Sequence, residues 1–148
     1  MKKKSQRLQP VQRLAEGHEQ RAARELGAAQ QRLDQARRQL AELVDYRADY
    51  RQRFRQAGAG GMGAAQLVDF QHFLLRLDQA IEQQTQMVAQ AGQELEGRRA
   101  QWFASRGKVK ALDGVAARYV AEEQRDALRR EQREQDDRTQ HTGRSAGH

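Results

Sequence analysis

The sequence predicts an all-α protein in which two long helices fold back on each other as an antiparallel coiled-coil hairpin. Apolar residues recur at alternating steps of three and four along two stretches, which is the spacing of a coiled-coil seam. A single glycine-rich stretch, residues 57–65, separates them. Aromatic residues make up only 5% of the chain and charged residues 32%, so there are too few bulky side chains for a compact layered core.

The first long helix is predicted over residues 10–57, after a basic segment at residues 1–9. Pro10 suits a first helical turn, where its fixed φ and missing N–H are tolerated. The expected seam contains Ala22, Leu26, Ala29, Leu33, Ala36, Leu40, Leu43, Tyr50 and Phe54. Nearer the N-terminus, Leu8, Val11, Leu14 and His18 keep helical spacing but leave this phase, which predicts a slightly shifted buried face there.

The chain is expected to turn at residues 58–64, where each glycine costs a helix about 1 kcal/mol relative to alanine. The glycine spacing formally matches a dinucleotide-binding fingerprint, but that motif requires a preceding strand, and helix is predicted here instead. We therefore interpret the stretch as the tip of the hairpin, which sets the pairing of the two helices. Folding at this tip is expected to place Phe54 opposite Leu67 and Leu33 opposite Val88.

The second long helix is predicted over residues 65–138, followed by a disordered tail over residues 139–148. Its seam is expected to include Leu67, Phe70, Leu74, Leu77, Ile81, Gln84, Val88, Ala91 and Leu95 and to continue to Tyr119. From about residue 122 the helix is rich in charge and has little to bury. We expect that end to be unpaired and supported by ion pairs one turn apart.

A second line of residues beside the seam is the main candidate site. Two sets step by four, three and four: Gln39, Leu43, Tyr46 and Tyr50 in the first helix, and Phe73, Leu77, Ala80 and Gln84 in the second. Because two helices seal only one seam, part of this set should stay exposed and mark a partner-binding surface. The alternative is that Tyr46 and Phe73 merely widen the seam near the tip.

No catalytic, cofactor-binding or metal-binding residue is expected. The chain has no cysteine, its four histidines lack metal-ligand spacing, and its serines have no neighbouring histidine. No apolar run approaches the roughly 20 residues of a membrane span. The net charge of +7 indicates an acidic partner or surface. A nucleic-acid-binding hairpin stays open as an alternative, although arginines and acids are interspersed along both helices.

The run Gln39-x-x-x-Leu43-x-x-Tyr46-x-x-x-Tyr50, with Phe73-x-x-x-Leu77-x-x-Ala80, resembles the FliJ family of flagellar type III export proteins. The basic start, the short tip and the charged end fit the same family. The resemblance implies a fold similar to the γ-subunit stalk of rotary ATPases. It also implies that these seven residues bind the export gate protein FlhA, with Gln84 standing where the family pattern carries a histidine.

The resemblance further implies a non-enzymatic stalk that needs no cofactor. Such a stalk couples the ring of the export ATPase FliI to the gate, with export chaperones as further partners. It implies a cytoplasmic location at the inner membrane, reached through those partners. The equivalent stalk of a virulence type III secretion system is the nearest alternative.

Overall fold

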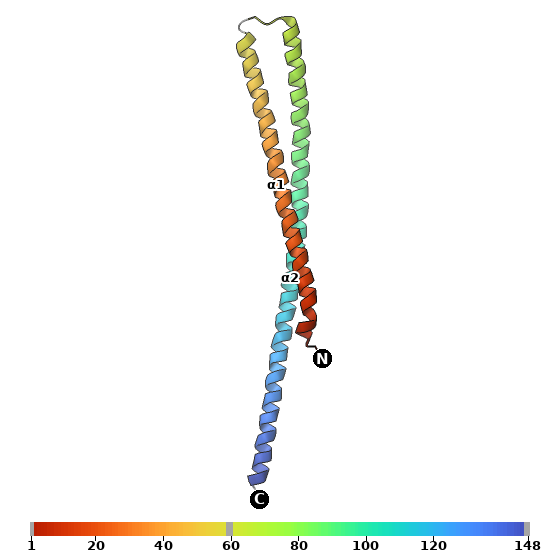
Figure 1. Ribbon diagram of the computed structural model, residues 1–148, viewed down its shortest axis with the longest axis vertical. Helices are drawn as coiled ribbons and strands as arrows, with labels where there is room; N and C mark the ends of the chain where they lie inside the picture. The colour runs from red at the N-terminus through yellow and green to blue at the C-terminus, as the bar shows by residue number, and fades with distance from the viewer. Residues whose placement is uncertain (1, 59–60, 147–148) are drawn as a thin grey trace. The chain divides into compact units, whose positions relative to one another are not determined.

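The computed structural model describes residues 2–58 and 61–146, which form two long helices, α1 (Lys4–Gly58) and α2 (Ala64–Ala146) (Figure 1). No strand occurs within these two ranges. The predicted all-α fold with two long packed helices is confirmed. Within the same ranges, no helix has both the length and the apolar character needed to cross a membrane.

Helix α1 begins six residues before its expected start, so Pro10 lies inside the helix. The early start is possible because N–H groups of the first turn find acceptors. The Lys3 N–H donates to Gln6 Oε1 at 3.3 Å, which is half of a capping box. The Arg7 N–H donates to the Lys3 carbonyl at 3.1 Å and closes the first helical turn.

Helix α2 continues to Ala146, through residues 139–146 of the segment that the sequence predicts to be disordered. The hydroxyl of Thr139 donates to the Gln135 carbonyl at 2.9 Å, and that of Thr142 donates to the Arg138 carbonyl at 2.7 Å. These bonds to the preceding turn satisfy the threonine hydroxyls within a helical backbone. Positions 147–148 of the predicted tail and positions 59–60 of the predicted tip lie outside the described residues.

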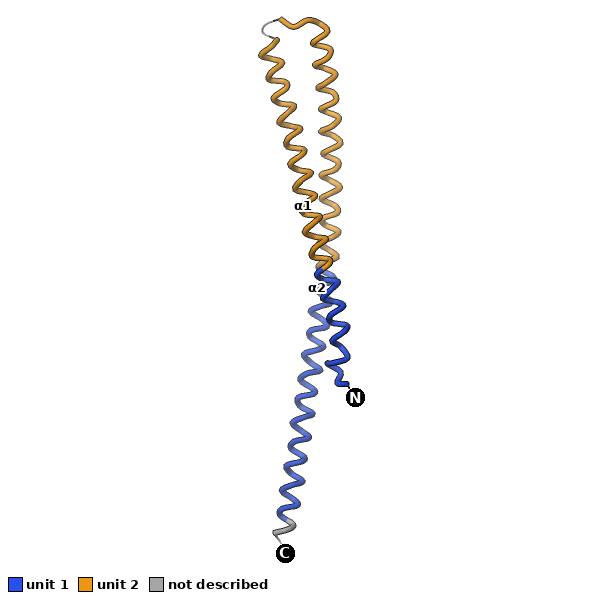
Figure 2. The backbone as a smooth tube through the Cα atoms, viewed as in Figure 1, with its two compact units in different colours: residues 1–20, 103–148 blue, residues 21–102 orange. Residues whose placement is uncertain are grey.

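The helices divide into two compact units, coloured in Figure 2. Unit 1 combines Met1–Gln20 with Phe103–His148, and unit 2 is Arg21–Trp102. In each unit a segment of α1 packs antiparallel to a segment of α2. Among the described residues, all buried side chains belong to unit 2: Ala22, Ala29, Leu33, Ala36, Leu77, Gln84 and Leu95.

The centre of unit 2 is a cluster of buried Ala29, Leu33 and Leu95. Half-buried Val88 packs against this cluster, as do Leu26 and Ala91. The predicted neighbours Leu33 and Val88 therefore do share one core. Small alanines at the seam let the two helices approach closely, while the leucines supply the buried apolar area.

Near the tip, the expected pairing of Phe54 with Leu67 is wrong. The Phe54 ring stacks on Phe70, with ring centroids 3.6 Å apart and planes at 11°, and Leu67 is exposed. The partner is thus shifted by three residues, almost one helical turn. Two stacked rings bury more apolar surface than a ring against a leucine, which favours Phe70 as the neighbour of Phe54.

Two arginines at seam positions of unit 2 do not leave a charge in the core. Arg47 reaches to the edge of the seam and pairs with Asp78, Nε to Oδ1 at 2.5 Å. Arg98 pairs in the same way with Glu25, Nη1 to Oε2 at 2.7 Å. The aliphatic stems cover the seam while the guanidinium groups stay partly hydrated.

In unit 1, the expected shift of the buried face of α1 is wrong. The half-buried positions are Ser5, Leu8, Gln12, Ala15 and Glu19, which continue the three-and-four spacing of the rest of α1. The exposed positions are Val11, Leu14 and His18. Changing phase would require local over- or underwinding of a continuous helix, so the geometry keeps the phase and accepts polar seam residues.

The first turn of α1 is held by Glu123 of α2. The Ser5 N–H donates to Glu123 Oε1 at 3.1 Å, and the Ser5 hydroxyl donates to Oε2 at 2.8 Å. Lys4 Nζ lies 5.6 Å from the centre of the Tyr119 ring. The hydrogen bond from the Ser5 backbone, aided by its hydroxyl and by Lys3, lowers the pKa of Glu123 below its usual 4.5.

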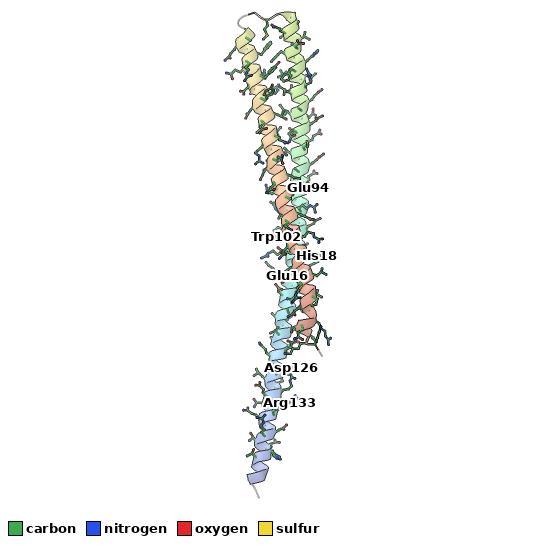
Figure 3. The ribbon with its side chains drawn as sticks, in the orientation of Figure 1. Glu16, His18, Glu94, Trp102, Asp126 and Arg133 are labelled. Carbon is green, nitrogen blue, oxygen red and sulfur yellow. The ribbon has the colours of Figure 1, made fainter. Side chains whose placement is uncertain are left out.

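Past Glu123, helix α2 has no segment of α1 beside it within unit 1. All side chains described from residue 124 to 143 are exposed, including Asp126 and Arg133 (Figure 3). Arg129 Nη1 lies 3.8 Å from Oδ1 of Asp126, which is one helical turn away. This end is a solvated helix, as its charge-rich sequence predicts.

Candidate partner-binding site

Five aromatic rings gather at the tip end of unit 2, and we call them the aromatic patch: Tyr46, Tyr50, Phe54, Phe70 and Phe73. Tyr50 lies at the middle, with its ring centroid 4.4 Å from Phe73 and 5.2 Å from Phe70. Tyr46 meets Phe73 edge to face at 6.1 Å and stacks on Tyr50 at 6.5 Å. Such ring contacts add about 0.5–1.5 kcal/mol each beyond area burial and fix the shape of the patch.

The residues predicted to bind a partner differ in exposure. Leu77 and Gln84 are buried; Leu43, Tyr50, Phe73 and Ala80 are half-buried; Gln39 and Tyr46 are exposed. Tyr46 keeps 50% of its surface accessible even though it contacts two other rings. A large ring held by its neighbours and half open to solvent is the kind of residue that anchors a partner.

Gln84 is only 8% exposed. Its Nε2 donates to the Ala36 carbonyl at 3.0 Å and to Gln39 Oε1 at 3.2 Å. It therefore supports Gln39 from beneath, and most of its own surface is hidden from a partner. A polar residue at a coiled-coil core position also favours one register over its neighbours.

The patch continues along one side of unit 2. Residues seven apart lie on the same side of a coiled coil: Arg32, Gln39, Tyr46 and Arg53 in α1, and Gln66, Phe73, Ala80, Met87 and Glu94 in α2. Two grooves open on this side. One, of about 410 Å³, runs from Tyr46 past Phe54 to Met62. The other, of about 370 Å³, lies between Gln39 and Met87.

A third groove of unit 2, lined by Val44 with Arg47, Arg51 and Arg55, differs in character. Its arginines make it basic, and it contains no aromatic ring. Val44 is nevertheless an exposed apolar residue two positions from Tyr46. It provides a natural comparison for any test of the aromatic patch.

Sequence reasoning assigned Phe54 and Phe70 to the seam and did not include Met87 in the site. Both rings do lie at the seam, but Phe70 contacts Tyr50 and so belongs to the aromatic patch. The available signal for Met87 was its place fourteen residues after Phe73 on the same side. Among the residues that the structure describes, no group of histidine and acidic side chains is arranged to hold a metal ion.

Comparison with known proteins identifies the family. The sequence profile described as "Flagellar FliJ protein" matches residues 3–147. A curated flagellar FliJ protein of Salmonella typhi is 28% identical over 114 residues, covering 77% of this chain and 78% of the relative. The flagellar FliJ protein of Escherichia coli (strain K12) is 28% identical over 111 residues, covering 75% of this chain and 76% of the relative. Because the profile matches nearly the whole length of the chain, the chain belongs to the FliJ family of flagellar proteins.

Proposed function

We propose that this chain is the non-enzymatic stalk of the flagellar type III export apparatus and that its aromatic patch, with Gln39 beside it, binds the export gate protein FlhA. Membership of the FliJ family makes the chain a flagellar export component. The gate contact rests on one observation, the half-exposed Tyr46 ring fixed against Phe73 and Tyr50.

The physical basis of the gate contact is preorganisation. Phe54 and Phe70 stack, and Tyr50 packs against Phe70 and Phe73, so the rings beneath Tyr46 are already ordered. A partner that covers Tyr46 therefore loses little side-chain entropy on this side of the interface. Gln39, oriented by buried Gln84, offers an amide at the edge of the same surface.

In this proposal the stalk couples the ring of the export ATPase FliI to the gate. The basic start of α1 and the extended end of α2 contact the ring, while unit 2 contacts the gate. Export chaperones are further helical partners. The chain then acts in the cytoplasm and reaches the inner membrane through these proteins. The coupling is mechanical and requires that both contacts form on one stalk.

The test is the double variant Tyr46→Ala with Phe73→Ala, assayed for binding to purified gate protein. We expect at least about a tenfold loss of affinity, since large aromatic anchors dominate interfaces. Circular dichroism should show nearly unchanged helicity, because the seam beneath is kept. Val44→Ala is the matched control, since it truncates an exposed apolar residue on the basic side and should leave gate binding unchanged.

Leu33→Ala is the second control. Leu33 is 3% exposed in the core cluster, so its truncation should lower the free energy of unfolding by about 2–5 kcal/mol. If the Tyr46 and Phe73 double variant unfolds as readily as Leu33→Ala, the rings are core residues and the proposed contact fails. Gate binding that persists in a folded double variant refutes the proposal directly.

A further inference from the structure

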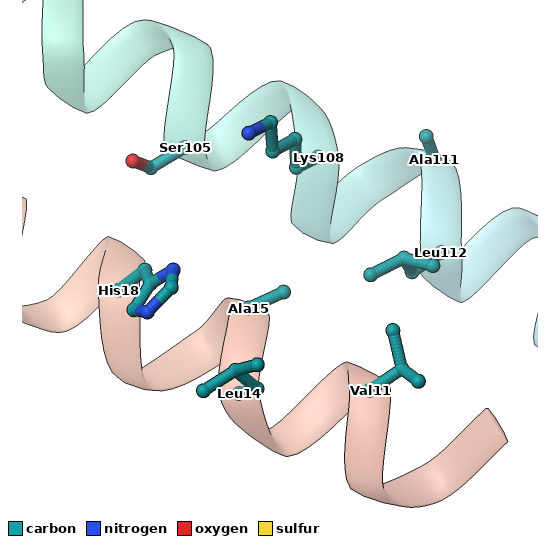
Figure 4. A pocket seen from close by; sticks show the side chains of 8 residues that line it. All are labelled: Val11, Leu14, Ala15, His18, Ser105, Lys108, Ala111 and Leu112. Carbon is teal, nitrogen blue, oxygen red and sulfur yellow. The ribbon is translucent and has the colours of Figure 1, made fainter.

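Unit 1 carries an exposed apolar groove that the gate contact does not use. It holds about 400 Å³ between the first part of α1 and the facing part of α2, and we call it the terminal groove (Figure 4). The lining residues are Val11, Leu14, Ala15, His18, Ser105, Lys108, Ala111 and Leu112. Val11 is 49% exposed and Leu14 62% exposed.

Along α1 at this groove, polar residues occupy seam positions and apolar residues lie outside the seam. Gln12 and Glu19 occupy half-buried seam positions, while Val11 and Leu14 are left outside. Gln12 Nε2 donates to Asp113 Oδ1 at 3.1 Å, which satisfies the seam polar group but buries little apolar surface. The apolar area that would stabilise this end of the pair is thus left open to a ligand.

The charged residues on the groove side are mostly basic. Lys108 lines the groove itself. Residues of unit 1 that lie one heptad away on the same side add Lys4, Arg7 and Arg118. Two heptads away follow Glu122, Arg125 and Asp126, so the bases outnumber the acids. An apolar stripe with a positive border complements an apolar stripe with a negative border.

We propose that the terminal groove binds an acidic amphipathic helix of a partner protein. The groove follows α1 from Val11 to His18, about 10 Å of helix axis, which suits anchors at one-turn spacing. The apolar stripe of the partner helix covers Leu14 and Val11, and its flanking carboxylates face Lys108. This inference does not depend on the gate contact, which lies in unit 2.

A peptide pair tests the chemistry with the full-length chain. One synthetic peptide carries leucine at heptad core positions with glutamate beside them, and its twin carries lysine in place of every glutamate. Isothermal titration calorimetry should show the acidic peptide binding at least about tenfold more tightly than its twin, because the border charges decide the preference. Added salt should narrow this difference.

Two variants locate the site. Leu14→Ser should weaken acidic-peptide binding at least about tenfold with little change in thermal stability, because Leu14 is mostly exposed. Lys108→Glu should move the preference toward the lysine twin. Val120→Ser is the matched control, since Val120 is an exposed apolar residue of unit 1 that does not line the groove. This variant should bind both peptides with the affinities of the unchanged chain.

Three results overturn the proposal. They are equal affinity for the two peptides, failure of the acidic peptide to bind at any soluble concentration, and acidic-peptide binding unaffected by Leu14→Ser. Light scattering on the free chain measures its molecular mass and so tests whether a second copy of the chain occupies the groove. A dimer that Leu14→Ser dissociates would assign the groove to a second copy of this chain and also refute the partner helix.

Discussion

Glu123 shows how a single carboxylate can determine where a helix begins. Its two oxygens accept from the Ser5 N–H and the Ser5 hydroxyl, at the positive end of α1. A terminal turn that precedes a proline would otherwise be left with free N–H groups. The contact also explains why α1 starts at Lys4 and not at Pro10.

This contact predicts a pH dependence at the start of α1. Because folding lowers the pKa of Glu123, its contribution is present above the unfolded pKa near 4.5 and is lost as the pH falls through the folded pKa. Nuclear magnetic resonance titration should show the Glu123 carboxylate and the Ser5 amide shifting together, with a midpoint below 4.5.

Ser5→Ala is the control for this titration. It keeps the backbone donor and removes the hydroxyl, so the pKa of Glu123 should rise part of the way toward its usual value. A Glu123 that titrates at or above its usual value, with a Ser5 amide that does not respond, would contradict the assigned contact.

Substitution of Gln84 should change the stability of the chain and its affinity for the gate protein in opposite directions. Gln84→Leu fills a buried seam position with an apolar side chain, and the Ala36 carbonyl keeps its helical hydrogen bond. We expect the free energy of unfolding in urea to rise by about 1 kcal/mol. Gate binding should weaken nonetheless, because Gln39 loses the donor that orients it.

Gln39→Ala completes this comparison. It removes the surface amide, while the Gln84 side chain keeps its hydrogen bond to the Ala36 carbonyl, so it should weaken gate binding with little change in stability. A Gln84→Leu variant that is less stable than the unchanged chain would show that the carboxamide is a net stabilising group and not a device for orientation and register.

At the scale of the helices, the three-and-four spacing predicted the elements and the seam of unit 2 because buried apolar residues there follow one phase. The prediction of the buried face of α1 was wrong at Val11 and Leu14, because that prediction assigns apolar residues to the seam and both residues are exposed. The spacing also named Leu67 as the partner of Phe54, whose ring stacks on Phe70, because spacing alone cannot choose between two seam residues one turn apart. Ring stacking, which chooses between them, depends on three-dimensional contact.

Gly61 in the connection and Gly97 in α2 have different roles. Replacing each with alanine should therefore change the free energy of unfolding in opposite directions. Gly61 has a φ of 85°, a conformation that costs other residues about 1 kcal/mol or more. Gly97 lies within α2, and a Cβ there would meet no atom within 4 Å.

We therefore expect Gly61→Ala to lower the free energy of unfolding by about 1 kcal/mol and Gly97→Ala to raise it by about the same amount. Urea denaturation of the two variants measures both changes. Equal effects would mean that the backbone at Gly61 relaxes on substitution and that the turn does not depend on glycine.

In the part of the chain that the structure describes, buried contacts are concentrated in one unit. The buried side chains found among the described residues all lie between Ala22 and Leu95. Among its described residues, unit 1 has only half-buried contacts, and several of its seam positions are polar. Long helices of this composition gain most of their stability from packing and little from helix propensity. In the proposed stalk, the more weakly packed unit contacts the ATPase ring, and the better-packed unit presents the gate surface.

Hydrogen exchange followed by mass spectrometry should reveal this asymmetry. Amides of residues 4–20 and 103–146 should exchange faster than those of residues 21–102, because local opening there breaks fewer buried contacts. Within unit 1, Glu123→Gln should speed exchange at the first turns of α1 and leave unit 2 unchanged. Binding of the acidic peptide at the terminal groove should slow exchange around Leu14 by mass action. Uniform protection of both units in the free chain would show that the half-buried seam of unit 1 resists local opening as well as the leucine core of unit 2 does.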